Sequence, residues 1–283
     1  MQVKTKAVMM VVGAALLWSS GGFLVKWVDW SALSIAGSRC IIAAFFLCLY
    51  LRRLPRFVKK PVFWLNALCY AGLVTNFVLA TKLTTAANAI FIQYMAPVYV
   101  ALLAPFILKE PTRGKDWIFI IIAIAGMALF FMDGLTLQGL EGNLIAIASG
   151  FCFALFNMTL RRIPKENVSD AVVWGNVLAF IICLPFFDFA NLPDAQGWMG
   201  IFILGAVQLG LAYYLFTQAS VHLAALELTV IPIIEPILNP IIVALFIGEV
   251  PGKWAIVGGI IVLTTITTWS VIKVKEKPAP ASS

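Results

Sequence analysis

The stretch NAIFIQYMAPVYVALLAPFILKE, residues 88–110, is echoed by ELTVIPIIEPILNPIIVALFIGE, residues 227–249. Aligned without a gap, the two stretches share residues at two notable positions: Pro97 with Pro236, and Glu110 with Glu249. A long apolar run that is interrupted by proline and closed by glutamate therefore occurs twice in this chain. The similarity is weak, but it indicates an internal duplication.

A second pair of stretches supports the duplication. Gly13–Val28 aligns with Ala148–Ile163, also without a gap, and sets an aromatic residue on an aromatic residue and a base on a base: Trp18 with Phe153, and Lys26 with Arg161. Both members of this pair precede the proline-containing stretches. The two halves of the chain therefore match in the same order.

The composition places the duplicated chain in a membrane. Hydrophobic residues make up 62% of the sequence, charged residues only 12%, and the mean hydropathy is +0.98, far from the values of soluble domains. Most of the apolar segments approach the length of about 20 residues that crosses a hydrocarbon core of about 30 Å. We predict ten spans: 7–28, 33–51, 62–81, 86–108, 116–132, 143–160, 170–187, 198–217, 226–247 and 254–272.

Ten spans divide into two sets of five. Because five is an odd number, the second copy must enter the bilayer in the opposite direction. The sequence thus predicts an all-α integral membrane protein: residues 1–136 form the first five-helix repeat, 137–275 the second, inverted repeat, and 276–283 a flexible cytoplasmic tail. Inverted repeats are typical of carriers that move a solute by alternating access around a site at the repeat interface.

The basic residues predict the orientation. Most of the 20 Lys and Arg fall in segments on the same side as the N-terminus, as expected for cytoplasmic loops. Both termini are therefore predicted in the cytoplasm, with the chain in the plasma (inner) membrane. The net charge of +7 is dispersed over short loops, so topology explains it better than a nucleic-acid partner does. The first apolar run lacks a small-residue cleavage site and is predicted to be a retained span.

Signatures of enzyme chemistry are missing from the sequence. The 5 cysteines lie in apolar segments without C-x-x-C spacing, and no H-E-x-x-H or G-x-S-x-G motif occurs. The sequence therefore predicts no metal, no cofactor and no catalytic residue. It also lacks an ATP-binding P-loop, so transport would use a gradient of solute or ions. An intramembrane enzyme and a receptor or scaffold without transport activity remain the alternatives from other classes.

Prolines and polar side chains at mid-membrane depth indicate where a solute could bind. Lipid offers such groups no hydrogen-bond partner, so they face a cavity or another helix. The ninth predicted span has prolines at four-residue spacing, and the fourth span has Pro97; the predicted helix breaks are Pro97, Pro232, Pro236 and Pro240. Each proline removes a hydrogen bond from the carbonyl four residues earlier, which then needs another partner.

Eight residues are the candidates for the solute site, because they place aromatic, amide or carboxyl groups at this depth: Trp18, Asn76, Gln93, Tyr94, Asn157, Tyr213, Glu235 and Asn239. Each has a plainer alternative. Trp18 could be packing bulk, the asparagines could join helices through hydrogen bonds, and Glu235 could be structural. Only one of Tyr213 and Tyr214 can face inward. A charged carboxylate at this depth is costly unless paired, so Glu235 could be neutral and hydrogen-bonded in at least one state, and a structural role is favoured over proton coupling.

Short motifs in order along nearly the whole chain carry a family resemblance: ALLWSS (15–20), SRC (38–40), APV (96–98), KE (109–110), EPILNP (235–240) and GE (248–249). In this order the chain resembles the EamA branch of the drug/metabolite transporter superfamily. The resemblance implies a ten-helix bundle with a central cavity, and many members export amino acids or other metabolites. By similarity, Glu235 matches the Glu of the family's Glu-Pro element. The first repeat has Ala96 at that place, so any role of the carboxylate is asymmetric.

We therefore predict a secondary carrier that exports a small amphipathic metabolite such as an amino acid. The alternative within transport is an importer or an uncoupled facilitator of a metabolite or drug. The expected partners are a small-molecule solute, the lipid bilayer and, if Glu235 exchanges protons, the proton. The sequence leaves the solute, the coupling ion and the oligomeric state open.

Overall fold

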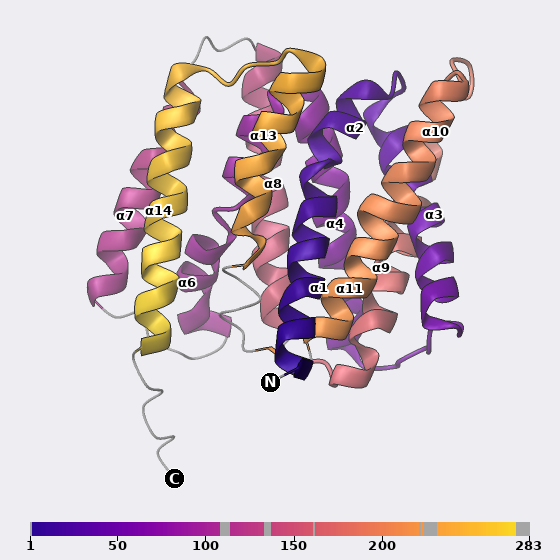
Figure 1. Cartoon of the computed structure of the whole chain (residues 1–283), viewed down its shortest axis with the longest axis horizontal. Coiled ribbons are helices and arrows are strands. Elements are labelled where there is room, and N and C mark those ends of the chain that lie inside the picture. Colours follow the sequence, from indigo (N-terminus) through magenta and orange to yellow (C-terminus); the bar gives the residue numbers. More distant parts are fainter. Residues whose placement is uncertain are drawn as a thin grey trace.

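Helices account for the whole regular structure of the described part of the chain. The computed structural model describes residues 2–107, 114–132, 137–160, 162–220, 222–223 and 231–275, and no strand occurs among them. The helices stand side by side in one bundle (Figure 1). Helix α1 begins and α14 ends at the same side of the bundle, the lower one in Figure 1. The all-α prediction is confirmed.

The described part of the first half contributes seven helices: α1 (Gln2–Ser19), α2 (Gly21–Trp27), α3 (Ala32–Leu51), α4 (Pro61–Leu83), α5 (Ala86–Gln93), α6 (Ala96–Ile107) and α7 (Gly114–Leu129). Two of the predicted spans, 7–28 and 86–108, are each divided into two helices. α1 and α2 meet at Ser20, and α5 and α6 meet next to Pro97, which occupies the first turn of α6.

The described helices of the second half are α8 (Leu137–Leu160), η1 (Lys165–Asn167), α9 (Val168–Cys183), η2 (Leu184–Phe186), α10 (Ala195–Ile203), η3 (Leu204–Leu211), α11 (Ala212–Ser220), η4 (Ile231–Ile233), α13 (Ile234–Ile247) and α14 (Lys253–Lys275). Segment η3 is a π-helix, which joins α10 to α11 into one long span. Insertions of this kind inside α-helices are frequent at functional sites.

Within the described ranges, seven helical stretches are long and apolar enough to cross a membrane: Val3–Trp27, Ala32–Leu51, Pro61–Leu83, Ala86–Leu103, Gly139–Leu160, Lys165–Phe186 and Ala195–Ser220. They coincide with seven of the predicted spans. The other three predicted spans correspond to α7, to Ile231–Ile247 and to Lys253–Trp269, which are apolar but shorter. Large apolar side chains are exposed on the outer faces of the bundle, as with Phe45 at 65% and Leu245 at 75%. Such surfaces suit lipid and not water.

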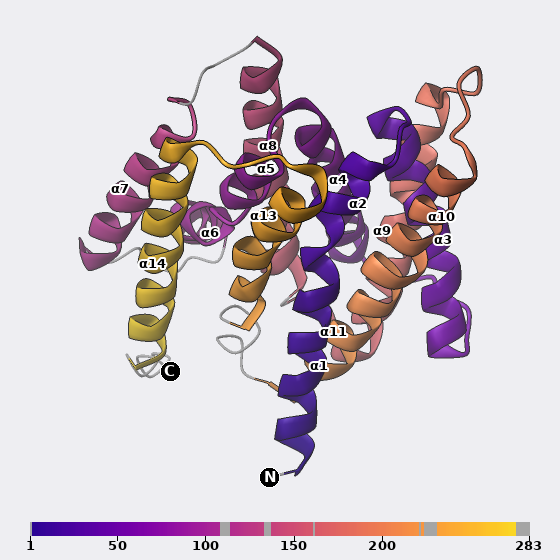
Figure 2. The ribbon, with the colours of Figure 1, turned by 45° about the horizontal axis from the view of Figure 1, so that its top comes forward.

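Helices of the two halves pack against one another throughout the bundle. α1 packs on α11 and α13 of the second half, and α8 packs on α4, α5 and α6 of the first half. α3 packs on α9, and α7 packs on α14. Figure 2 shows α1 beside both α11 and α13. The core is therefore shared between the halves, and neither half is a separate globule.

The prolines of the ninth predicted span differ in their effect. Pro232 lies in the short η4 turn and Pro236 in the first turn of α13, where Pro236 has no N–H to offer the Pro232 carbonyl four residues earlier. Pro240, by contrast, does not break the helix. α13 continues through it to Ile247, so the predicted break at Pro240 is wrong. The physical reason is that proline keeps a helical φ angle, and only the Pro236 carbonyl loses its partner.

Candidate functional site

The interruption between α1 and α2 brings two amides of the second half against the first span. A Cβ atom on Gly21 would lie 2.7 Å from Nε2 of Gln208, and one on Gly22 would overlap Oδ1 of Asn239. A side chain at either position would force the facing amide to move. Gln208 lies in the π-helix η3 and Asn239 in α13, so three interrupted or irregular helices meet at this point.

Polar atoms at this meeting point lack partners. Asn239 is fully buried, and neither amide atom makes a hydrogen bond to a described residue. Oε1 of buried Gln208 and Nε1 of Trp18 are also without a described partner. The Gln208 Nε2 donates a long 3.4 Å bond to the Trp18 carbonyl. Buried polar groups in native proteins are almost always satisfied. A polar ligand or water bound between α1, η3 and α13 would satisfy these atoms.

Tyr94 and Glu235 join the proline helices of the two halves. The Tyr94 hydroxyl, at the junction of α5 and α6, lies 2.8 Å from Oε2 of Glu235 and 3.0 Å from the carbonyl of Pro232. Pro236 has no N–H to give to that carbonyl, so Tyr94 replaces the missing helical donor. The predicted need of the Pro232 carbonyl for another partner is thus confirmed.

The hydrogen-bond inventory favours a proton on Glu235. Tyr94 carries one hydroxyl proton, which can serve either the Glu235 carboxylate or the Pro232 carbonyl. With a protonated Glu235, the carboxyl donates to the Tyr94 oxygen while Tyr94 donates to Pro232. Both short distances then correspond to good hydrogen bonds. No cation forms an ion pair with Glu235 among the described residues.

An aromatic wall borders the same region. The Trp18 ring lies 5.0 Å from the Tyr213 ring and 5.4 Å from the Phe216 ring, and Tyr213 packs edge-on to Tyr70 at 5.0 Å. Tyr213 is buried, whereas Tyr214 is half-buried and turns to Tyr50 on α3. Tyr213 is therefore the inward-facing tyrosine of the pair.

The remaining candidates lie around α8. Gln93 is buried, and its Oε1 accepts a hydrogen bond from Ser149 at 2.9 Å, which joins α5 to α8. Asn76 and Asn157 are half-buried and make no side-chain hydrogen bond to another described residue. The structure thus brings Tyr213 against Trp18 on α1, Asn239 against Gly22 on α2, and Tyr94 against Glu235. It does not bring Asn76 or Asn157 into these contacts.

Two buried polar residues, Gln208 and Arg39, were not among the eight candidates from the sequence. Gln208 lies in a π-helix, which could not be predicted from the sequence. Arg39 is 1% exposed and gives one hydrogen bond, 2.7 Å from Nη2 to the Val74 carbonyl, while its Nε and Nη1 have no partner.

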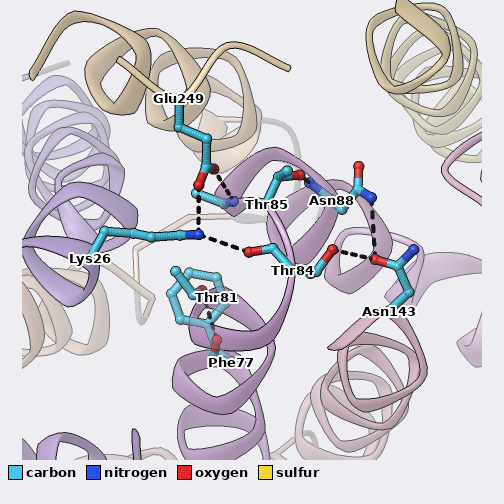
Figure 3. Close-up of polar contacts among 9 residues, drawn as sticks. Lys26, Phe77, Thr81, Thr84, Thr85, Asn88, Asn143 and Glu249 are labelled. Atoms are coloured by element: carbon cyan, nitrogen blue, oxygen red, sulfur yellow. Dashed lines mark hydrogen bonds and ion pairs between the residues drawn. The ribbon is translucent and has the colours of Figure 1, made fainter. Parts of the chain in front are cut away.

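A polar cluster closes the bundle at the side away from the start of α1 (Figure 3). Lys26 Nζ lies 2.6 Å from Glu249 Oε2 and donates to the Thr84 carbonyl at 2.8 Å. The other oxygen of Glu249 accepts the Ala86 N–H at 2.7 Å. Thr84 continues the network to Asn143 on α8, at 2.9 Å. The cluster therefore joins α2, the α4–α5 turn, α8 and the loop after α13.

Metal chemistry has no visible site in the part of the chain that the structure describes. No group of three or more His, Cys, Asp or Glu side chains that could hold an ion occurs there. The 5 cysteines are all free thiols.

Comparisons with known proteins agree with this arrangement. The sequence profile of the EamA-like transporter family matches residues 5–132 and again residues 140–270. The uncharacterized transporter YwfM of Bacillus subtilis is 25% identical over 96% of both chains. The threonine/homoserine exporter RhtA of Salmonella typhimurium is 25% identical, over 77% of this chain and 73% of its own. A solved crystal structure with 18% identity has the same fold, with a TM-score of 0.62 over 96% of this chain and 99% of the other.

Proposed function

The chain belongs to the EamA-like transporter family, and we propose that it is a secondary carrier that exports small amphipathic metabolites, such as amino acids, by alternating access. As a family member it is a multi-pass protein of the plasma membrane. The observation that carries the proposal is the central cluster at Gly21 and Gly22. Buried, unpartnered amides of the second half meet an interrupted span of the first half there.

The proposal includes the inverted repeat of ten spans with both termini in the cytoplasm. The packing of α1 on α11 and α13 corresponds to that of α8 on α4, α5 and α6, which supports a two-fold relationship between residues 1–136 and 137–275. The family profile also matches each half once. In such carriers the site lies at mid-membrane between the repeats, framed by interrupted helices. Trp18, Gln208 and Asn239 fit that place.

The chemistry of the region supports an amphipathic, zwitterionic solute. The Trp18 and Tyr213 rings offer an apolar wall, and the amides offer both donors and acceptors. The buried side chains of Arg39 and Glu235 offer a cation and a carboxyl group. The export direction is supported by the likeness to a threonine/homoserine exporter.

The coupling ion in this proposal is the proton, carried by Glu235. The carboxyl group is buried and bonded to Tyr94, and its proton completes two hydrogen bonds at once. Release of that proton would leave Tyr94 with one proton for two acceptors and would weaken the contact between α5 and α13. Protonation would thus change the packing of the proline helices.

A ligand screen tests the solute part of the proposal. Purified protein is heated with amino acids, cationic drugs, nucleosides and vitamins, because a ligand that binds only the folded state raises the unfolding temperature. We expect a zwitterionic amino acid to stabilise the wild-type protein and to lose this effect in Asn239→Ala. Stabilisation by nucleosides or vitamins alone would contradict the proposed solute class.

A further inference from the structure

The ion pair between Lys26 and Glu249 ties together parts of the chain that the proposed transport cycle must separate. Lys26 stands in the last turn of α2, and Glu249 follows α13 directly after Gly248, whose φ of 77° ends that helix in a left-handed turn. The charged atoms are 2.6 Å apart, and the side chains are only 17% and 22% exposed. A pair that is mostly shielded from water is stronger than a surface pair.

Both members of the pair also bind the backbone of the turn between α4 and α5. Lys26 donates a hydrogen bond to the carbonyl of Thr84, the C-cap residue of α4. Glu249 accepts a hydrogen bond from the N–H of Ala86, the first residue of α5. These groups have no helical partners of their own because they lie at helix ends. The pair therefore clamps three segments at one point (Figure 3).

The clamp is in direct contact with the central site. The Cβ of Ala86 would lie 3.1 Å from a Cβ on Gly22, and Gly22 packs on Asn239. α13 carries Glu235 and Asn239 along its length and ends next to Glu249. A movement of α13 away from α2 and α5 must therefore break the ion pair, and the same movement uncovers Asn239 from this side.

We propose that Lys26 and Glu249 form the latch that closes the outer side of the carrier over its central site. The inference rests on the proposed function and on the proposed topology, which puts this end of the bundle outside the cell. In the conformation described here the latch is shut. When the latch opens, α13 moves away from the α4–α5 turn. The carrier is then in its outward-facing state, and the solute can leave.

Lys82 provides a matched control close to the latch. Its Nζ donates to the Val28 carbonyl at 2.6 Å, so it fastens the same end of α2 as Lys26 does. Both ends of that bond belong to the first half of the chain, however, and no described carboxylate forms an ion pair with Lys82. The loss of the Lys82 amine therefore removes a charged hydrogen bond but leaves the contacts between the two halves in place.

Thiol labelling tests the latch without any solute. A single cysteine replaces Asn239 in a variant whose 5 natural cysteines are alanine, and intact cells are treated with a membrane-impermeant maleimide. Lys26→Met, Glu249→Gln and the double variant are compared with Lys82→Met. We expect each latch variant to label on the order of tenfold faster than the parent, since a charged hydrogen bond of this kind corresponds to about one decade in an equilibrium constant. Lys82→Met should label at the parental rate.

The labelling rate of the double variant shows whether Lys26 and Glu249 act as one ion pair or through two independent contacts. If the two side chains act as one latch, the double variant labels no faster than the faster single variant. Multiplied effects in the double variant, or unchanged labelling in both single variants, would overturn the proposal. A faster reaction seen only in inside-out vesicles would also overturn it, because the latch would then close the cytoplasmic side. A failure of the proposed transport function can be distinguished from a failure of the latch, since none of these labelling rates depends on flux.

If the cysteine-free background does not fold, hydrogen exchange answers the same question in the natural chain. The Ala86 amide is protected by Glu249 in the closed state. Glu249→Gln and Lys26→Met should both speed its exchange together with that of neighbouring amides in α5, whereas Lys82→Met should not. Exchange in α5 that is equal in all three variants would contradict the latch.

Discussion

The hydroxyl of Tyr94 lies 2.8 Å from the carboxyl group of Glu235 and 3.0 Å from the carbonyl that Pro236 deprives of its helical donor. One side chain of the first half thus completes a proline helix of the second half. The contact also places a titratable group where the two halves meet. The roles of Glu235 in structure and in transport can therefore be separated by substitution.

Glu235→Gln should fold and exchange solute but lose the dependence of flux on a pH gradient. The amide N–H can donate to the Tyr94 oxygen as a protonated carboxyl does, so the hydrogen bonds are retained while the exchangeable proton is removed. The measurement is flux in liposomes with and without an imposed pH gradient. A Gln variant that responds to the gradient as the wild type does would exclude Glu235 as the proton carrier and leave it a structural residue.

Tyr94→Phe should lower the free energy of unfolding by about 1–2 kcal/mol, because the Pro232 carbonyl and the Glu235 carboxyl both lose their partner. Tyr99→Phe is the control, since among the described residues the Tyr99 hydroxyl has only a long 3.7 Å contact, with the Met127 sulfur. Denaturation of both variants in the same detergent measures the difference. Equal stability of the two variants would show that the Tyr94 bonds contribute little.

Trp18→Phe should weaken solute binding more than it weakens the fold. The benzene ring of Phe retains contacts with Tyr213 and Phe216. The indole N–H of Trp18 has no hydrogen-bond partner among the described residues, so its loss leaves no protein acceptor unsatisfied. Trp64→Phe should show the opposite pattern, because the Trp64 indole donates to the Val58 carbonyl at 2.8 Å. Ligand-induced thermal shifts and unfolding in the absence of ligand separate the two effects. Unchanged ligand affinity in Trp18→Phe would remove this N–H from the site.

Cysteine labelling of intact cells should place the two ends of the bundle on opposite sides of the membrane. Positions next to Lys59 and Lys165 should react only after the cells are opened, whereas positions next to Leu137 and Asp194 should react from outside. The expectation follows from the distribution of Lys and Arg. Labelling of Lys59 and Leu137 positions from the same side is incompatible with the inverted repeat.

Much of the membrane architecture could be predicted because it depends on local properties of the chain. Length and apolar composition locate the seven stretches long enough to span, and the proline interruption next to Pro97 follows from the missing N–H of proline. Pro240 shows the limit of that rule. A proline within an apolar helix can be tolerated when the flanking turns are held by neighbouring helices, and the sequence does not show those neighbours.

The contacts that make the site were harder to predict, since they join residues far apart in the chain. Glu235 and Tyr94 were both candidates, but nothing in the sequence pairs them. Lys26 and Glu249 looked like residues at span ends, and only the packing of α2 against α13 shows that they meet. Their repeat-related positions, Arg161 and Glu110, lie outside the described residues.

Flux through the purified protein tests the central claim most directly. Liposomes containing only this protein are loaded with an unlabelled amino acid that stabilises it, and uptake of the labelled amino acid is followed by counterflow. We predict saturable exchange without ATP in the wild type, and at least tenfold slower exchange in Asn239→Ala, since the ligand would lose a buried hydrogen-bonding partner. A ligand that binds the wild-type protein but is never exchanged across the bilayer would contradict the account of this protein as a carrier.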